Sequence, residues 1–538
     1  MFTGKLVPSL TLGAALWLLS SASVCAQEET APAATGLEPR KIVILHTNDV
    51  HGRVGPERGR GGLTRIATLV KQYRAANPNN VIYLDAGDVA QGTPVSSFSK
   101  GAAAFSAIAA MHPAAGTIGN HEFDWGVDQL LEMTVGACYP FVVANVLNPD
   151  TNKPIFAPYL VTEVDGIKVG IIGVISKETV DIVKRGNTGG LIFVDPATTV
   201  RNYLPAMREK GAQLIVALSH CGLEEDKQLA AAVPEIDFIV GGHTHDALEH
   251  AINIGGHTWI AQAGKYAQNL GVNELSVSPY NGKILGVESK LIPIGEKDTT
   301  IEDPEVLSIL KKYEDKVKPI MAEVVGKLKG DFSKQTGEEC ADCPLGNAIC
   351  EAMCKSTNSD VAFYNFGGIR LDKLKSGEVT RGDFFALMPF DDALRVLQVK
   401  GSVIKNVLDY AAAVKGHGPI QGSGFTCTLD KAKGEARDIV INGEPLDLEK
   451  TYRLATTEFL AGGGDGFGML RGEEVVENGE FAREVMVEYL KGLKEWSVPA
   501  TGNMKVVKHA IESASGSAAP SPENGKESDK ESAKENDK

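Results

Sequence analysis

Short apolar runs rich in β-branched residues recur along the first half of the chain, and segments with helical spacing separate them. The first two runs are residues 42–45 and 81–84, and a helical pattern covers residues 62–75 between them. Continuous apolar runs that alternate with helices are typical of strands whose two faces are both buried. The sequence therefore predicts a layered α/β domain over residues 41–300. Further strands are predicted at 141–144, 168–175, 214–218 and 237–240.

Histidine, aspartate and asparagine residues follow five apolar runs, at the point where each run ends. Because ligand sites in open α/β sheets gather beyond the carboxyl ends of the strands, we expect these side chains to converge. Imidazole and carboxylate groups are good ligands for Zn²⁺ and Mn²⁺, and the two oxygens of Asp88 suit a bridge between two ions. The candidates are Asp49, His51, Asp88, Asn120, His121, His220, His243 and His245.

Each of these motifs has an ordinary explanation when it is taken alone. Asparagine and aspartate in loops usually form turns, and a single histidine after a strand is more often a hydrogen-bonded polar residue. The complete set, in which each member follows an apolar run, is what indicates a site for two divalent ions.

The two ends of the chain differ from its centre in composition. Residues 1–26 combine a lysine, a short apolar run and small residues before a polar segment, which is typical of a cleaved signal peptide; the alternative is an uncleaved membrane anchor. A polar leader (27–40) follows, and the tail (508–538) has so few apolar residues that we predict disorder. No later segment reaches transmembrane length, so we expect a periplasmic or secreted protein without a stable membrane span.

The net charge of -15 makes the chain a poor general ligand for the backbone of a nucleic-acid polymer. A phosphate ester would need local positive charge here, and bound metal ions are a source of it. We therefore expect a protein that acts on small molecules. We also expect it to be a monomer.

Four of the eight cysteines form a cluster, with Cys340 and Cys343 in a CxxC motif and with Cys350 and Cys354 on a predicted helix. Cysteines of an exported protein are expected to oxidise, which favours disulfide bonds within this cluster, and a zinc knuckle is the alternative. Removal of Cys25 with the signal peptide leaves an odd number of cysteines. We therefore expect a free thiol, for which Cys221 is a candidate.

A helix with a clear start signal separates two parts of the chain. Asp303 is suited to cap this helix, Pro304 is suited to its first turn, and Pro319 is expected to end it. We therefore predict a connecting helix within residues 301–323, followed by a smaller domain of mixed α/β structure over residues 324–507.

The candidate metal ligands stand in strings that resemble those of a known family. The segments ILHTNDVHG, LDAGD, GNHEFDWG and GGHTH are similar to those of the calcineurin-like metallophosphoesterases, and in particular of the exported 5′-nucleotidases. The resemblance implies a four-layer α/β-β-α sandwich and two metal sites that share Asp88. It assigns Asp49, His51 and His245 to one ion, and Asn120, His220 and His243 to the other.

The resemblance also assigns a catalytic pair, which falls on His121 and Asp124. A protonated His121 would stabilise the phosphoryl oxygens or the leaving group, and Asp124 would hold its tautomer and charge. The alternative interpretation of Asp124 is a helix cap.

The later motifs resemble the C-terminal nucleoside-binding domain of the same family. The string NFGGIR (365–370) follows the apolar run 361–364, and a glycine-rich loop occupies 461–466. Glycines allow the backbone to approach a ligand closely, and an arginine can bind phosphate with two donors. The substrate-binding residues that the resemblance implies are Asn365, Arg370, Phe390, Phe459 and Asp465.

In the family's arrangement, Phe390 and Phe459 would enclose the base and Asp465 would hold the ribose hydroxyls. The alternative for either phenylalanine is an ordinary core position, and the alternative for the glycine-rich loop is a plain turn. This chain departs from the family at Phe366, where a glycine is usual, and it has lysines instead of arginines before Leu345.

The expected function is therefore hydrolysis of nucleoside 5′-monophosphates to nucleoside and phosphate by an exported enzyme that uses two divalent ions, Zn²⁺ or Mn²⁺. UDP-sugar hydrolysis and 2′,3′-cyclic phosphodiesterase activity with 3′-nucleotidase action are the alternatives among enzymes. A non-catalytic nucleotide-binding surface protein is the alternative of another class, and the intact ligand set argues against it.

Overall fold

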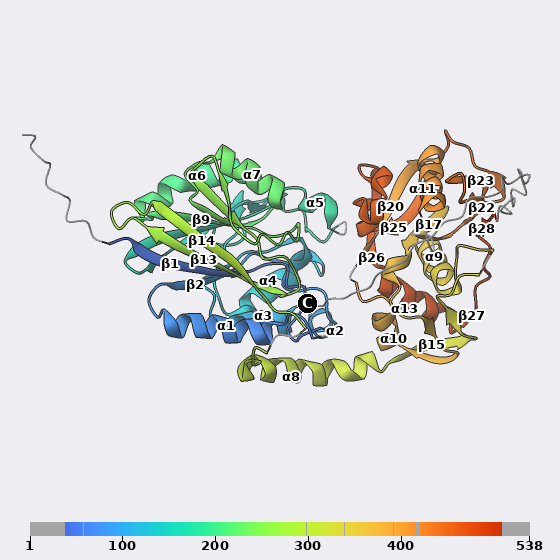
Figure 1. Cartoon of the computed structure of the whole chain (residues 1–538), viewed down its shortest axis with the longest axis horizontal. Coiled ribbons are helices and arrows are strands. Elements are labelled where there is room, and N and C mark those ends of the chain that lie inside the picture. Colours follow the sequence, from blue (N-terminus) through green and yellow to red (C-terminus); the bar gives the residue numbers. More distant parts are fainter. Residues whose placement is uncertain are drawn as a thin grey trace, which may run out of the picture.

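The protein forms two lobes that a long helix connects (Figure 1). The computed structural model describes residues 38–57, 59–183, 186–296, 299–337, 339–390, 392–414 and 420–507. The predicted signal peptide, the leader up to residue 37 and the tail lie outside these described residues. Within the described ranges, no helix combines the length and the hydrophobicity needed to cross a membrane.

Two sheets form the centre of the N-terminal lobe (residues 38–296). The first has the order β14-β13-β1-β2-β3, in which β1 (Arg40–Thr47) is parallel to β2 (Val81–Asp85). Its other strands are β3 (Ala115–Gly116), β13 (Asn269–Val277) and β14 (Ile284–Pro293). The second has the order β11-β12-β10-β9-β7-β6, with β6 (Tyr159–Val164), β7 (Ile167–Ile175), β9 (Leu214–His220), β10 (Phe238–Val240), β11 (Ile252–Ile254) and β12 (Thr258–Ala261).

The apolar runs form these layers because alternate residues of a strand point to opposite faces. In β1, Ile42 and Ile44 belong to the core between the two sheets, whereas Val43 and Leu45 pack toward outer helices. The outer layers are formed by α1 (Leu63–Ala76), α3 (Ala102–Ala109) and α4 (Val127–Ala137) on one sheet, and by α6 (Pro196–Glu209) and α7 (Leu223–Ala232) on the other. This arrangement confirms the predicted four-layer fold.

One predicted strand is wrong. Residues 141–144 form only isolated bridges, at Phe141 and Val142. The N–H groups of Val142, Val143 and Ala144 donate to Gly116, Ala157 and Gly173 respectively. Because these three carbonyls belong to three different segments, no continuous ladder forms.

The connecting helix α8 (Pro304–Met321) begins as predicted, because Asp303 Oδ1 accepts hydrogen bonds from the N–H groups of Glu305 and Val306. Lys71 of α1 pairs with both Asp303 and Glu305 and so holds the start of α8 against the N-terminal lobe. The prediction that Pro319 ends the helix is wrong, since Pro319 lies inside it. Only the last turn follows this proline, so little of the helical ladder is lost.

The C-terminal lobe (residues 324–507) is built on a sheet of order β21-β17-β25-β20-β26. In β17, Ala362 and Tyr364 pack toward α9 and α13, whereas Val361 and Phe363 pack toward α11 and a second sheet. The elements are α9 (Pro344–Thr357), β17 (Val361–Asn365), β20 (Ala393–Lys400), α11 (Gly401–Ala413), β21 (Ile420–Ser423), β25 (Thr451–Thr457), β26 (Glu474–Phe481) and α13 (Ala482–Leu493). The second sheet has the order β24-β23-β22-β28, with β22 (Phe425–Asp430), β23 (Glu435–Ile441), β24 (Glu444–Pro445) and β28 (Met504–Val506).

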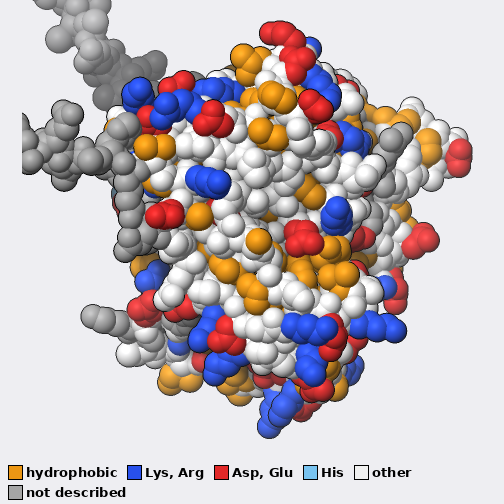
Figure 2. Space-filling view, turned by 90° about the vertical axis from the view of Figure 1, so that its right-hand side faces the viewer, with side chains coloured by type: hydrophobic (Ala, Val, Ile, Leu, Met, Phe, Trp, Pro, Cys, Tyr) orange, Lys and Arg blue, Asp and Glu red, His pale blue; other side chains and the backbone are white. Residues whose placement is uncertain are grey.

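The outer end of the C-terminal lobe carries acidic and basic side chains side by side (Figure 2). On the face that this view shows, neither sign of charge forms a continuous surface. A nucleic-acid polymer would need a continuous basic surface, so this face does not suit one.

The disulfide bonds predicted for the cysteine cluster are wrong, because all seven described cysteines are free thiols. Cys343 Sγ accepts a hydrogen bond from the N–H of Gly346 and caps α9, whereas Cys354 Sγ lies 3.8 Å from the carbonyl of Ser423. The two sulfurs thus make separate local contacts. None of the groups of possible metal ligands found among the described residues contains a cysteine, and Cys221 is free and buried as predicted.

His46 of β1 provides a test of the packing of the first sheet. The side chain is 1% exposed, and neither ring nitrogen has a hydrogen-bond partner among the described residues. Burial lowers the pKa of His46 from 6.5 to about 4. As the pH falls, His46 therefore becomes protonated near pH 6.5 in the unfolded chain but only near pH 4 in the folded chain. The free energy of unfolding therefore decreases as the pH falls through this window.

We predict that this residue contributes up to roughly 3 kcal/mol of the acid destabilisation. In His46→Leu, the unfolding temperature should fall less between pH 7 and pH 4.5 than in the wild type, as measured by calorimetry. His250→Leu, which changes an exposed histidine, should keep the wild-type pH dependence. Equal slopes in all three proteins would contradict this assignment.

Candidate active site

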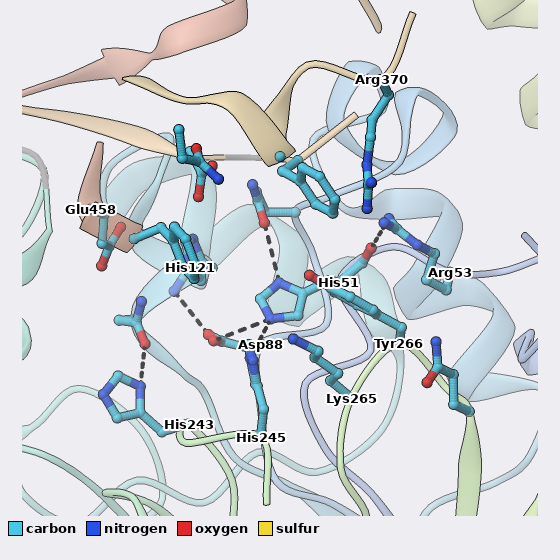
Figure 3. Close-up of a pocket in the computed structure, with 18 of the residues that line it drawn as sticks. His51, Arg53, Asp88, His121, His243, His245, Lys265, Tyr266, Arg370 and Glu458 are labelled. Atoms are coloured by element: carbon cyan, nitrogen blue, oxygen red, sulfur yellow. Dashed lines mark hydrogen bonds and ion pairs between the residues drawn. The ribbon is translucent and has the colours of Figure 1, made fainter. Parts of the chain in front are cut away.

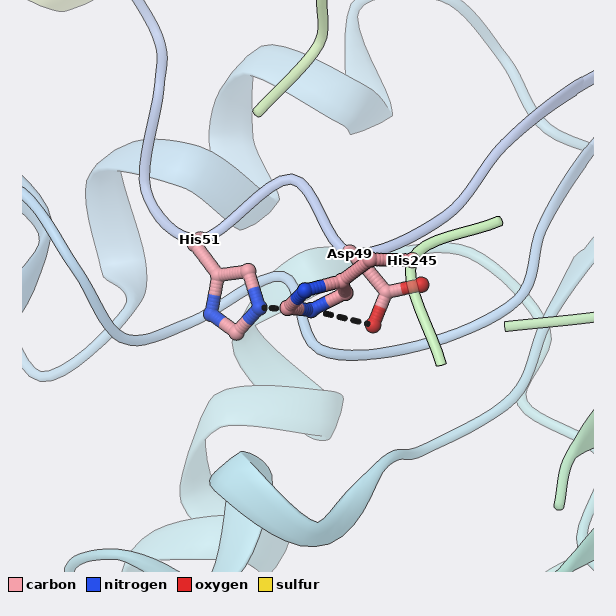
Figure 4. Close-up of side chains that lie close together, drawn as sticks. All are labelled: Asp49, His51 and His245. Atoms are coloured by element: carbon pink, nitrogen blue, oxygen red, sulfur yellow. Dashed lines mark hydrogen bonds and ion pairs between the residues drawn. The ribbon is translucent and has the colours of Figure 1, made fainter. Parts of the chain in front are cut away.

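Side chains that follow the strands of the two N-terminal sheets come together at one edge of the lobe (Figure 3). One group joins the loop after β1 to the loop after β10 (Figure 4). His245 Nε2 lies 3.4 Å from Asp49 Oδ1 and 3.1 Å from His51 Nε2. The structure thus brings three potential metal-ligand atoms together, all within 4.8 Å of one another.

A second group joins the loops that follow β2, β3 and β10 to the last residue of β9. Asp88 Oδ2 lies 3.2 Å from His220 Nε2, and these two residues form a second triplet of potential ligands with His243. Asn120 reaches this triplet through Oδ1, which is 2.9 Å from His243 Nδ1. Asp88 Oδ2 is also 3.9 Å from His51 Nε2, so the Asp88 carboxylate stands between the two groups.

The backbone holds five of these residues in a conformation that residues other than glycine rarely adopt. Such a conformation costs on the order of 1 kcal/mol or more at each residue and persists where the surrounding structure enforces it, often at functional sites. The loops therefore direct these side chains toward one another at a local cost. The residues with positive φ are Asp49 (50°), His51 (48°), Asp88 (53°), His243 (80°) and His245 (62°).

His220 shows that a positive charge belongs at this edge. Its Nδ1 lies 2.7 Å from the carbonyl oxygen of Ala86, which can only accept, so Nδ1 carries a proton and Nε2 faces Asp88. Nε2 is buried without a hydrogen-bond partner among the described residues. Burial opposes protonation, but the Asp88 carboxylate outweighs it and raises the pKa of His220 to about 10. Either a proton or a metal ion must therefore separate the lone pair of Nε2 from the carboxylate.

The imidazoles of His51 and His243 are in the form that binds metal. Burial lowers the pKa of His51 to about 3 and that of His243 to about 4, so both rings are neutral at physiological pH. Metal ions bind neutral imidazole and ionised carboxylate, which are the groups that converge here. The residues present therefore fit divalent metal ions.

The predicted catalytic pair is in direct contact. His121 Nδ1 lies 3.0 Å from Asp124 Oδ2, and the side chain of Asn187 donates to the backbone carbonyl of Asp124. Burial alone would lower the pKa of His121, but the carboxylates of Asp124 and Asp88 outweigh it and hold that pKa well above its ordinary value. The pair is therefore an imidazolium beside a carboxylate at the wall of the cavity.

Glu122 is a supporting residue to which the sequence analysis gave no role, although it lies in the quoted string GNHE. Its carboxylate accepts hydrogen bonds from the N–H groups of Asp88, Val89 and Ala90 in the loop after β2, at 2.8 to 3.0 Å. It also accepts from the N–H of Gly119 in the loop after β3. One buried carboxylate thus holds together the two loops that carry Asp88 and Asn120. Its position directly after Asn120 and His121 in the string GNHEFDWG was the available signal.

Gly119 allows this close approach. A Cβ atom at this position would lie 2.1 Å from Asp88 Oδ1 and 2.7 Å from His220 Nε2. Any larger residue would therefore displace a potential metal ligand.

The two lobes enclose a cavity of about 650 Å³ that contains the histidine and aspartate edge. His121 and five of the potential ligands (His51, Asp88, Asn120, His243 and His245) line it from the N-terminal side. The C-terminal lobe contributes all five residues that the sequence assigned to substrate binding. These are Asn365, Arg370, Phe390, Phe459 and Asp465.

Neither of the two phenylalanines lies in the core. Phe459 is 42% exposed, and its ring lies against Gly464, where a Cβ atom would approach to 2.5 Å. Phe390 is half-buried, and the Arg370 guanidinium lies 5.0 Å from the centre of its ring. Asn365 Nδ2 donates to Asp465 Oδ2, which links the NFGGIR segment to the glycine-rich loop.

Phe366, the departure from the family pattern, does not remove its neighbours from the cavity. It packs against the C-terminal core, and Lys334 Nζ lies 4.4 Å from the centre of its ring. Asn365, Gly367 and Arg370 on either side still line the cavity.

Several cavity residues were not singled out from the sequence. Arg53, Gln91, Lys265, Tyr266, Gln268 and Asp392 line the wall, as does Glu458 beside His121 (Figure 3). The position of Glu458 directly before Phe459 is a signal for that residue. The others face the cavity because of loop geometry that no short motif encodes.

Hydrolysis of a phosphate ester with the help of divalent metal is the chemistry that this fold and this edge define together. Residues 42–247 match the family model for calcineurin-like phosphoesterases, and residues 324–472 match the model for the C-terminal domain of 5′-nucleotidases. The chain is therefore a metal-dependent phosphoric ester hydrolase.

Whole-chain relatives define the family more narrowly. The chain is 30% identical to the 5′-nucleotidase of Diplobatis ommata over 516 residues, which cover 85% of this chain and 88% of that protein. The crystal structure of the 5′-nucleotidase precursor of Thermus thermophilus has 28% identity and a TM-score of 0.59 and covers 88% of this chain and 100% of its own. The NAD nucleotidase of Haemophilus influenzae shares the fold, with 23% identity, a TM-score of 0.66 and coverage of 87% and 99%. This chain belongs to the 5′-nucleotidase family.

Glu122 generates a prediction about metal affinity. Glu122→Gln keeps the size of the side chain but replaces one acceptor oxygen with an NH₂ group, which cannot accept the N–H groups now bound there. We predict that the affinity for divalent metal falls by roughly 10- to 100-fold, as is usual when a residue that orients metal ligands is changed. Metal titration followed by elemental analysis would measure the loss.

Glu132→Gln is the matched control, because Glu132 is exposed on α4. It should bind metal as the wild type does. Unchanged metal affinity in Glu122→Gln would contradict the role given to this carboxylate.

Proposed function

We propose that this enzyme hydrolyses nucleoside 5′-monophosphates to nucleoside and phosphate with two divalent ions, Zn²⁺ or Mn²⁺. The observation that carries the proposal is the single cavity in which the ligand edge of one lobe faces aromatic and polar residues of the other. A nucleotide has a phosphate at one end, which suits the ligand edge, and a planar base at the other, which suits the aromatic residues.

One ion would be held by Asp49, His51, Asp88 and His245, and the other by Asp88, Asn120, His220 and His243. Two bound divalent ions would supply an activated water and neutralise charge on the phosphoryl group. Two ligand triplets, Asp49–His51–His245 and Asp88–His220–His243, support this assignment, and Asp88 Oδ2 lies 3.9 Å from His51 Nε2 of the first.

His121 would act beside the ions. Its imidazolium, held by Asp124 through Nδ1, presents positive charge and the Nε2 donor to the phosphoryl oxygens or the leaving oxygen. Because the carboxylates keep its pKa well above the ordinary value, His121 would remain protonated through the neutral range.

The C-terminal lobe would bind the nucleoside. Phe390 and Phe459, which both line the cavity, would stack on the base, and Asp465 would offer carboxylate oxygens to the ribose hydroxyls. Arg370 would bind phosphate oxygens with two donors. Stacking accepts every base, so we expect broad use of different nucleoside monophosphates.

The expected site of action is the periplasm or the cell exterior, and the expected form is a monomer. The composition of residues 1–26 supports export. The enclosure of the cavity by a single chain supports a monomer, because no second copy is needed to complete it.

A second candidate function is the hydrolysis of larger esters such as UDP-sugars. A chamber of about 380 Å³ opens next to the main cavity and shares Arg53, Tyr266, Arg370 and Phe390 with it. It provides space for a second group beyond the nucleotide.

A nucleotide panel tests the proposal. With added Mn²⁺ or Zn²⁺, AMP should be hydrolysed faster than UDP-glucose or 2′,3′-cyclic AMP, and chelation should abolish hydrolysis. The products are followed by chromatography, because the first hydrolysis of UDP-glucose or of the cyclic nucleotide releases no inorganic phosphate. His121→Ala should lower kcat for AMP by about 100-fold or more, the usual effect of losing a general acid. Hydrolysis of another ester but not of AMP would reject the proposal, as would undiminished turnover in His121→Ala.

The base-binding assignment makes a separate prediction. Phe459→Ala should raise KM for AMP by roughly tenfold, because stacking on one base contributes about 1–3 kcal/mol. Hydrolysis of 4-nitrophenyl phosphate, which has no nucleoside, should change little. Tyr280→Ala removes an exposed aromatic from the N-terminal lobe and serves as the control. Equal losses on both substrates would contradict the stacking role.

A further inference from the structure

Arg395 of β20 connects the two lobes at a point close to the catalytic pair. Its side chain is only 6% exposed. Nη2 donates to the carbonyl oxygen of Ile182, at the end of α5 (Thr179–Ile182) in the N-terminal lobe. The same nitrogen lies 3.1 Å from Glu458 Oε2 in its own lobe. A buried guanidinium is costly unless it is paired, and here one side chain is paired in both directions.

A second contact between the lobes lies beside Arg395. Asn478 Nδ2 of β26 donates to the carbonyl of Val183, the next residue of the N-terminal lobe. Between the lobes lies a small cavity of about 30 Å³, and His121, Asp124, Arg395 and Glu458 all line it. The interlobe contact and the catalytic pair therefore share one wall.

Glu458 extends this connection toward the substrate. It is the first residue of α12 (Glu458–Ala461) and directly precedes Phe459. Glu458 also lines the main cavity with Phe459 and His121. Through Glu458, Arg395 is therefore tied to the residue beside the exposed phenylalanine, and through Ile182 to the lobe that carries the potential metal ligands.

We propose that Arg395 is a positioning residue that sets where the nucleoside-binding face lies relative to the metal-binding edge. The inference rests on the proposed function, since it assigns Phe459 to the base. Hydrolysis requires the phosphate to reach the metal edge while the base stays stacked, and an error of about 1 Å in such an arrangement can cost about 100-fold in rate. A substrate without a nucleoside does not span the two lobes and does not depend on Arg395.

Steady-state kinetics on two substrates test this role in the full-length, metal-loaded enzyme. In Arg395→Ala, kcat/KM for AMP should fall by about 10- to 100-fold, and kcat/KM for 4-nitrophenyl phosphate should stay within about twofold. Arg395→Lys keeps the charge and a donor and should restore part of the loss. Equal losses on both substrates, or no loss on either, would overturn the proposal.

Arg453→Ala is the matched control. Arg453 lies on β25, next to β20, and pairs with Glu477 and two backbone carbonyls that all belong to the C-terminal lobe. It should not alter the ratio of the two kcat/KM values.

Hydrogen exchange provides a readout that does not depend on turnover. Arg395→Ala should speed amide exchange both in residues 179–183 and in residues 456–461, because Arg395 holds these two segments together. Arg453→Ala should speed neither. Unchanged exchange in both segments of Arg395→Ala would overturn the proposal even if AMP is a substrate. A wild-type enzyme that fails to hydrolyse AMP would instead reject the proposed function.

Discussion

The Asp88 carboxylate is the group on which the rest of this site depends. It is buried, it faces His220 and His51 through Oδ2, and it accepts a hydrogen bond from the N–H of His121 through Oδ1. A buried carboxylate is costly unless positive charge compensates it. Metal ions on either side of Asp88 would provide that charge, and the imidazole groups around it are of the type that holds such ions.

The four-layer fold supplies the rigidity that this arrangement needs. The buried strands place their carboxyl ends along one edge, and Glu122 fastens its own loop to the loop after β2 with three hydrogen bonds. The unusual backbone conformations of Asp49, His51 and Asp88 are then enforced by the core below and do not relax. In the proposed function, the specificity of the reaction would depend on the other lobe, whose aromatic residues line the cavity.

Much of the N-terminal fold and of the candidate metal site could be predicted from the sequence. Strands buried on both faces must be apolar, and the potential metal ligands follow these strands directly. The runs at 42–45 and 214–218 lie within β1 and β9. The strand predicted at 141–144 was wrong, because the N–H groups of this run donate to three different segments. A local sequence pattern cannot reveal which segments those partners belong to. The prediction of disulfide bonds in the cysteine cluster was wrong for a related reason. The spacing of the cysteines and the expected export favour oxidation, but in the fold Cys343 and Cys354 make separate contacts.

The candidate site residues were found from motifs, whereas the residues that hold them in position were not. The role of Glu122 exists only once two loops meet, and that of Arg395 only once two lobes meet. Neither contact leaves a periodic or spaced pattern in the chain. The sequence therefore predicts the groups that carry the chemistry better than the groups that position them.

Anomalous diffraction from crystals of the mature chain grown with Mn²⁺ tests the central claim most directly. Our account predicts two manganese peaks on either side of the Asp88 carboxylate, one among Asp49, His51 and His245 and the other among Asn120, His220 and His243. A single peak, peaks away from Asp88, or no peak at saturating Mn²⁺ would contradict it.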